Sequence, residues 1–99
     1  AAVAAYDRSI HAAARRQTPG SVAATCVDCH SAHEVRASTD PASMTYALNL
    51  PQTCSRCHGD AAIIERGHIA AGNVADLFKD SIHGRAISRS GLLVAANCT

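Results

Sequence analysis

The chain has few large apolar side chains: among 99 residues there is no Trp, one Phe, two Tyr and one Met. Hydrophobic residue types make up 47% of the sequence, but many are alanine, whose side chain buries little area. A chain of this length already has a marginal core. A core of side chains alone is therefore a poor source of stability, whereas alanine-rich helices could pack closely against a large apolar ligand. The alternative is that the alanine content reflects helix propensity alone.

Long hydrophobic runs and an excess of one charge are also absent. No stretch approaches the ~20 apolar residues of a membrane span. Asp7 and Arg8 interrupt any apolar run at the start, so we expect no signal peptide there and a mature or trimmed beginning. The formal charge of +1 excludes a strongly basic surface for nucleic acid. The sequence predicts a soluble chain with no membrane span and no nucleic-acid partner.

Cysteine and histidine, in contrast, are plentiful, with five and six residues. Four of the cysteines lie in two C-x-x-C-H runs, Cys26-Val27-Asp28-Cys29-His30 and Cys54-Ser55-Arg56-Cys57-His58, the attachment pattern of a c-type haem. Thiols three residues apart can add across the two vinyl groups at one porphyrin edge, and the next histidine is then carried under the ring. The sequence predicts two haems c, bound through Cys26, Cys29, Cys54 and Cys57, with His30 and His58 as proximal iron ligands. Because this attachment takes place outside the cytoplasm, a periplasmic or extracellular location is expected.

Structural zinc is the alternative for the same thiols. They form a C-x2-C-x24-C-x2-C pattern that could chelate one Zn²⁺ ion tetrahedrally. A zinc ribbon, however, needs no histidine directly after each cysteine pair. The haem interpretation is therefore favoured.

The histidines outside the two runs are candidates for the distal faces of the irons: His11, His33, His83 and His68. Each 72-residue period supplies one Ser-Ile-His and one His three residues after a run, which is two distal candidates for two haems. His68 is outside this set. His33 follows His30 by three residues, so it lies on the same side of the chain as that proximal ligand. It cannot easily reach the far face of its own haem, and we expect it to bind the iron of a neighbouring haem. We therefore expect His33 on the Cys54/Cys57 haem and His11 on the Cys26/Cys29 haem. The alternative is that His83 binds one of these two irons.

Residues 1–27 and 73–99 form an internal repeat. A shift of 72 positions aligns 27 residues without a gap, of which eight are identical, including Ser9-Ile10-His11 with Ser81-Ile82-His83. Cys98 then falls on Cys26, the first cysteine of a haem run. We expect residues 1–99 to be a single domain that is part of a longer chain, with a third haem beginning at Cys98; the alternative is a free or disulfide-bonded Cys98 thiol.

The expected fold is mostly α, with much irregular loop and no significant β-sheet. Alanine-rich residues 1–17 predict one helix, ended by Thr18-Pro19-Gly20. Asn73 is a suitable N-cap for a helix that runs through Ile82. Between them, short helical segments and turns surround the two haem runs.

These stretches resemble the multihaem c-type cytochrome family. The resemblance covers Tyr6 to Cys98 and is carried by Ser81 to Gly84 (Ser-Ile-His-Gly), by Cys26 to His33 (Cys-x-Asp-Cys-His-x-x-His), and by Asp40 to Ser43 leading to Thr53 to His58. It implies short helices wrapped around tightly spaced bis-His haems. Two positions depart from the pattern: Ala12 follows the first Ser-Ile-His, and Ser31 follows His30 where glycine is often found.

Electron transfer is the function that these features favour, with redox proteins or neighbouring cytochrome subunits as partners, in a carrier, homo-oligomer or filament. Iron with two histidine ligands has no vacant position for substrate, and bis-His ligation favours a lower potential than His/Met ligation. The alternative is a fragment of a multihaem oxidoreductase acting on a small nitrogen or sulfur compound, which would need an open axial position. The sequence leaves the electron donor and acceptor open.

Overall fold

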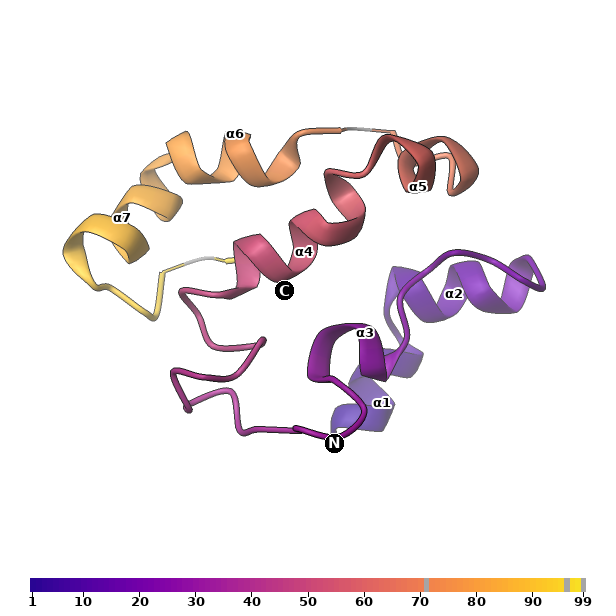
Figure 1. The fold of residues 1–99 in the computed structure, drawn as a ribbon, viewed down its shortest axis with the longest axis horizontal. Helices are drawn as coiled ribbons and strands as arrows, with labels where there is room; N and C mark the ends of the chain where they lie inside the picture. Colours follow the sequence, from indigo (N-terminus) through magenta and orange to yellow (C-terminus); the bar gives the residue numbers. More distant parts are fainter. Residues whose placement is uncertain (71, 96, 99) are drawn as a thin grey trace.

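The computed structural model describes residues 1–70, 72–95 and 97–98, and is helical with irregular connections (Figure 1). The helices are α1 (Ala2–Asp7), α2 (Ile10–Gln17), α3 (Cys26–His30), α4 (Leu50–His58), α5 (Ala61–Arg66), α6 (Val74–Asp80) and α7 (Ile82–Ser90). Those residues contain no strand, so the predicted mostly α fold without a β-sheet is confirmed. None of these helices is long and apolar enough to cross a membrane; the longest have nine residues.

The helices form two groups. In one, α4 packs against α5 and α6, and α6 packs against α7; in the other, α1 packs against α2. Figure 1 shows α4 in the middle of the molecule, with α6 on one side and the N-terminal helices on the other. The buried apolar residues are Ala12, Ala75 and Ile87, and no large side chain in the described part is fully buried. The side-chain core is therefore thin, as the composition predicts.

The first predicted helix is in fact two, because the chain breaks at Arg8 and Ser9. The Ser9 side chain accepts a hydrogen bond from the backbone N–H of Ala12, and the Ser9 N–H bonds to the Tyr6 carbonyl at 2.8 Å. Serine is among the best N-cap residues because its hydroxyl satisfies an N–H that has no partner within the helix. The prediction of one helix over residues 1–17 was wrong at this junction.

The same junction occurs 72 residues later. Ser81 caps α7 by accepting from the Gly84 N–H, and its own N–H bonds to the Phe78 carbonyl at 3.0 Å. The helix predicted to run from Asn73 through Ile82 is thus also two helices. Asn73 precedes α6 in a left-handed conformation and makes no side-chain cap bond. Two aligned positions of the repeat, Ala96 and Thr99, lie outside the described residues.

Replacement of Gly84 by alanine is expected to destabilise the α6–α7 junction. A Cβ at this position would collide with the Phe78 carbonyl oxygen and lie 2.9 Å from the Lys79 Cα. Forcing an extra carbon into such a contact costs about 1–3 kcal/mol. The matched control is Ala12→Gly at the equivalent position of the repeat, which creates no new contact. It should lose the helix propensity of alanine, about 1 kcal/mol, and the burial of one methyl group, about 0.8 kcal/mol. Denaturant unfolding of the two variants measures both; a Gly84→Ala protein as stable as the parent would contradict the close approach.

Side-chain hydrogen bonds hold the loops against the helices. The Tyr6 hydroxyl donates to the Ala24 carbonyl at 2.8 Å, and Arg15 donates to the carbonyls of Ser21 and Ala23. The segment before α3 is thereby tied to α1 and α2. On the other side of α3, Asn49 donates to the carbonyls of Pro41 and Ser43, which fixes the loop that enters α4. The segments that lead into both C-x-x-C-H runs are therefore held in place by side-chain hydrogen bonds.

Candidate functional site

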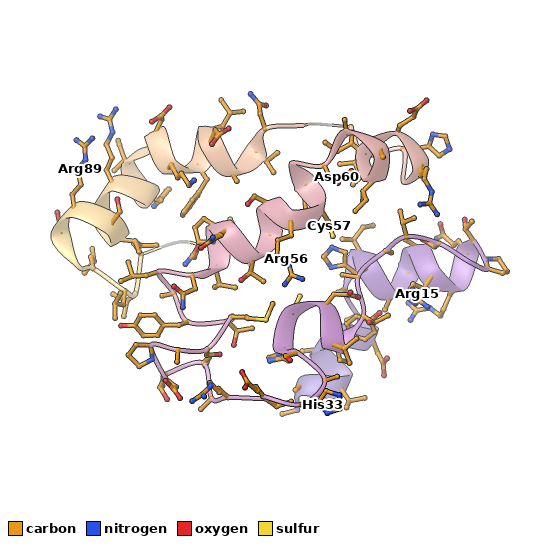
Figure 2. The ribbon with its side chains drawn as sticks, in the orientation of Figure 1. Arg15, His33, Arg56, Cys57, Asp60 and Arg89 are labelled. Carbon is orange, nitrogen blue, oxygen red and sulfur yellow. The ribbon has the colours of Figure 1, made fainter. Side chains whose placement is uncertain are left out.

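Each C-x-x-C-H run is helical. The first run is α3 in its entirety, and the second forms the last five residues of α4. In α4, Pro51 occupies the first turn, where its missing N–H leaves no intrahelical bond unmade. A helical turn places residues three or four apart on one face. Cys54 and Cys57 therefore share a face of α4, and Figure 2 shows the Cys57 side chain on α4 near the region of α2.

Asp28, within the first run, fixes the start of α3. Its carboxylate accepts hydrogen bonds from the Thr25 backbone N–H at 2.7 Å and from the Thr25 hydroxyl at 2.8 Å. These bonds, the backbone bond above all, lower the pKa of Asp28 from its ordinary value of 3.8.

Removal of this bond by Asp28→Ala should cost about 1 kcal/mol, as the loss of a capping interaction does. The lowered pKa means that the ionised carboxylate stabilises the folded state. Its contribution is therefore fully present above the ordinary value of 3.8 and is lost as the pH falls through the lowered value. Guanidinium unfolding of parent and variant at several pH values measures this difference, with Asp28→Asn as the uncharged control. A gap between parent and Asp28→Ala that stays constant into strong acid would contradict the role of the charge.

A cavity of about 320 Å³ lies between the N-terminal helices and α4 and α5. This volume is within the range of small-molecule sites. Most of its wall is apolar: Ile10, Ala14, Val22, Ala23, Ala24, Ile63 and Ile69. Its sulfur and imidazole groups come from both runs and from outside them: Cys29, Cys54, Cys57, His58, His11 and His68. Both thiols of the second predicted attachment site and Cys29 of the first therefore line one common space.

The His11 and His58 rings lie side by side in this wall. Their centroids are 6.2 Å apart and their planes are inclined by 68°. Both residues are half-buried, whereas His30, His33, His68 and His83 are exposed. The structure thus brings His11 beside the histidine of the second run. The sequence-based assignment placed it on the haem of the first.

Two of the cavity thiols, those of Cys54 and Cys29, have raised pKa values. Burial, followed by the proximity of Cys98, raises the pKa of Cys54 from 9.0 to about 11. Burial also raises the pKa of Cys29, with a smaller contribution from Asp28. Protonated thiols suit an apolar wall, since a buried thiolate would be poorly solvated. Cys26 is the exposed thiol of the first run.

Cys98 lies against the second run, since the Cys54 thiol contacts the Cys98 carbonyl at 3.9 Å. The segment is anchored by Asn97, whose side chain donates to the Ala47 carbonyl at 2.7 Å and accepts from the Cys98 N–H. The predicted third haem at Cys98 stays a prediction. Sequence alone carried no signal for this contact between residues 44 positions apart.

His68 is the fourth candidate for a distal ligand. It lines the cavity from the loop after α5, with a backbone φ of 50° that non-glycine residues rarely adopt. His33 and His83 do not line this cavity, and Figure 2 shows His33 at the edge of the molecule, away from α4. Met44 is not in its wall either; its sulfur accepts a weak bond from Arg56 at 3.9 Å.

Over residues 1–70, 72–95 and 97–98, no three or more His, Cys, Asp or Glu side chains converge as ligands for a metal ion. The thiols of the two runs therefore do not form the tetrahedral set that structural zinc needs. The same residues suit a c-type haem, which asks for a thiol pair, an adjacent histidine and an apolar wall. Comparisons with protein-family models, curated proteins and solved structures find no match for this chain.

Proposed function

We propose that this chain transfers electrons through two c-type haems, attached at Cys26/Cys29 and at Cys54/Cys57. The observation that carries the proposal is the common cavity: Cys29 of the first run and Cys54, Cys57 and His58 of the second line the same apolar space. Haem supplies the one-electron Fe(III)/Fe(II) couple, and the protein sets its position and potential.

The residues of the chain then have distinct tasks. The thiols hold the porphyrin edges, and His30 and His58 bind iron from the proximal side. The apolar side chains of the cavity exclude water, which strengthens the electrostatic influence of nearby groups on the potential. Arg15 and Arg56 are the cations close enough to Asp28 to lower its pKa. Their positive charge is also suited to balancing haem propionates.

Two attachment sites at one cavity favour electron transfer between the haems. Extension of the 72-residue repeat would lengthen such a path, and redox proteins or neighbouring subunits would take up the electrons. Covalent attachment places the protein in the periplasm or outside the cell. The chain has six histidines for the four axial positions of two irons, which favours transfer through fully coordinated haems over catalysis.

Intact mass of the denatured protein, followed by a reductive titration, tests the proposal. Thioether-bound haem stays attached on unfolding, so at least two haem additions per chain are expected. The titration should show reversible reduction of each haem. A polypeptide mass without haem would reject the proposal, while tight binding of cyanide to the native ferric protein would favour the oxidoreductase alternative.

A further inference from the structure

We infer that His11 and His58 are the two axial ligands of a single iron, that of the haem attached to Cys54 and Cys57. The inference rests on the proposed function, because it requires a haem at the second run. It replaces the assignment of His33 to that iron. It also removes His11 from the haem on Cys26 and Cys29.

The ring separation matches coordination of one metal atom. An imidazole nitrogen binds a metal at about 2 Å and the ring centre lies about 1 Å behind it, so two imidazoles on opposite sides of one atom have centres about 6 Å apart. The centroids of His11 and His58 are 6.2 Å apart. The 68° between the planes is compatible with this, since each ring can rotate about its metal–nitrogen bond.

Edge-to-face packing of two rings gives a similar separation, so the surroundings must decide. The two histidines lie in the wall of the cavity that also contains both thiols of the second run. His58 directly follows Cys57, so a haem on these thiols lies beside its ring. His11 comes from a different helix, so the backbone next to His58 does not confine it to the same side of the ring.

The start of α2 holds His11 in place. His11 is the second residue of the helix, and the Ser9 cap together with the Ser9–Tyr6 backbone bond fixes the orientation of that first turn. The neighbouring Ala12 is 4% exposed, which anchors the turn in the small core. A ligand on such a supported turn is pre-organised and loses little entropy on binding.

The competing histidines are less well placed. His33 is exposed, lies outside the cavity wall and is drawn in Figure 2 away from α4. His83 has the same Ser-Ile-His context as His11, but it is exposed and is not in the wall. His68 is in the wall, yet it is exposed and lies on a loop. Within the described part of the chain, His11 is the histidine whose ring pairs with that of His58.

The test is the spin state of the haems in the full chain. His11→Gly opens one axial position, so the low-spin signal in electron paramagnetic resonance should lose one haem equivalent and a high-spin signal should replace it. Added imidazole should restore the low-spin signal. Arg16→Gly is the matched control, because it places the same flexible residue on the exposed side of α2 without touching the cavity. A second variant, His11→Met, should raise the potential of one haem, as His/Met ligation does.

A second experiment shows which iron loses an axial ligand in His11→Gly. It uses the full chain with Cys26→Ala and Cys29→Ala, which retains only the haem on Cys54 and Cys57. His11→Gly should convert that haem to high spin, whereas His33→Gly should leave it low spin. The reverse result, or full haem loading with an unchanged spin state in His11→Gly and an unchanged potential in His11→Met, would overturn the inference alone. A chain without covalent haem would instead overturn the proposed function.

Discussion

Produced without haem, this chain is expected to show no cooperative unfolding transition. Among the residues that the structure describes, the buried apolar core consists of three, two of them alanine. The accessible surface of 6923 Å² exceeds the roughly 5,300 Å² typical of a folded protein of this mass. The helices are five to nine residues long, below the ~12–15 at which isolated helices become marginally stable. Side chains alone therefore cannot offset the entropy of ordering the chain.

Expression in a cytoplasm that lacks haem-attachment enzymes provides the material, and circular dichroism during heating provides the measurement. The haem-free chain should lose its residual helicity gradually and bind a hydrophobic dye. The holoprotein, treated identically, should melt in a sharp transition. A sharp transition in the haem-free chain, with a urea m-value of about 1–3 kcal/mol/M, would show that the side-chain core is sufficient.

Removal of the second pair of thiols by Cys54→Ala with Cys57→Ala is expected to halve the haem content and to change the shape of the redox titration. Because Cys29 of the first run lines the same cavity as Cys54 and Cys57, reduction of one proposed haem would add a negative charge close to the other. At an effective dielectric constant of about 20, unit charges ~10 Å apart interact by about 1.7 kcal/mol. The two-haem protein should therefore titrate over a wider range than either haem alone.

The matched variant is Cys26→Ala with Cys29→Ala, which leaves the other haem. Each single-haem chain should follow a simple one-electron curve in spectroelectrochemistry. If the curve of the parent equals the sum of the two single-haem curves, the haems are electrically independent and the shared cavity has no role in coupling them. Intact mass of each variant verifies that one haem remains.

The helical fold could be predicted from sequence because its signals are local. Alanine content, the C-x-x-C-H turns and the breaking residues after Gln17 lie within short windows. The breaks at Ser9 and Ser81 were missed because apolar spacing continues across them, and the decisive interaction is a serine hydroxyl bonding to an N–H three residues on. The repeated Ser-Ile-His was the available signal, since serine before an apolar residue is a good helix start.

The proximity of the His11 and His58 rings could not be predicted from local signals. His11 and His58 come from different helices, and their proximity depends on how α2 packs across the cavity from α4. Spacing along the chain favoured His33, because spacing indicates only on which side of its own segment a side chain lies. It does not indicate how distant helices pack. The place of His68 in the wall follows from the loop after α5, which counting of ligands does not reveal.

The residue after the first proximal histidine offers a route to protein engineering. Ser31 has a φ of 65° and a ψ of 163°, a backbone conformation that is almost exclusive to glycine and that costs other residues about 1–3 kcal/mol. The family pattern often has glycine here. A serine at this place means that the rest of the molecule enforces the turn. A single exchange of Ser31 for glycine would therefore relax the backbone beside His30 without touching the cavity. A search for more stable variants of this chain could begin with this residue.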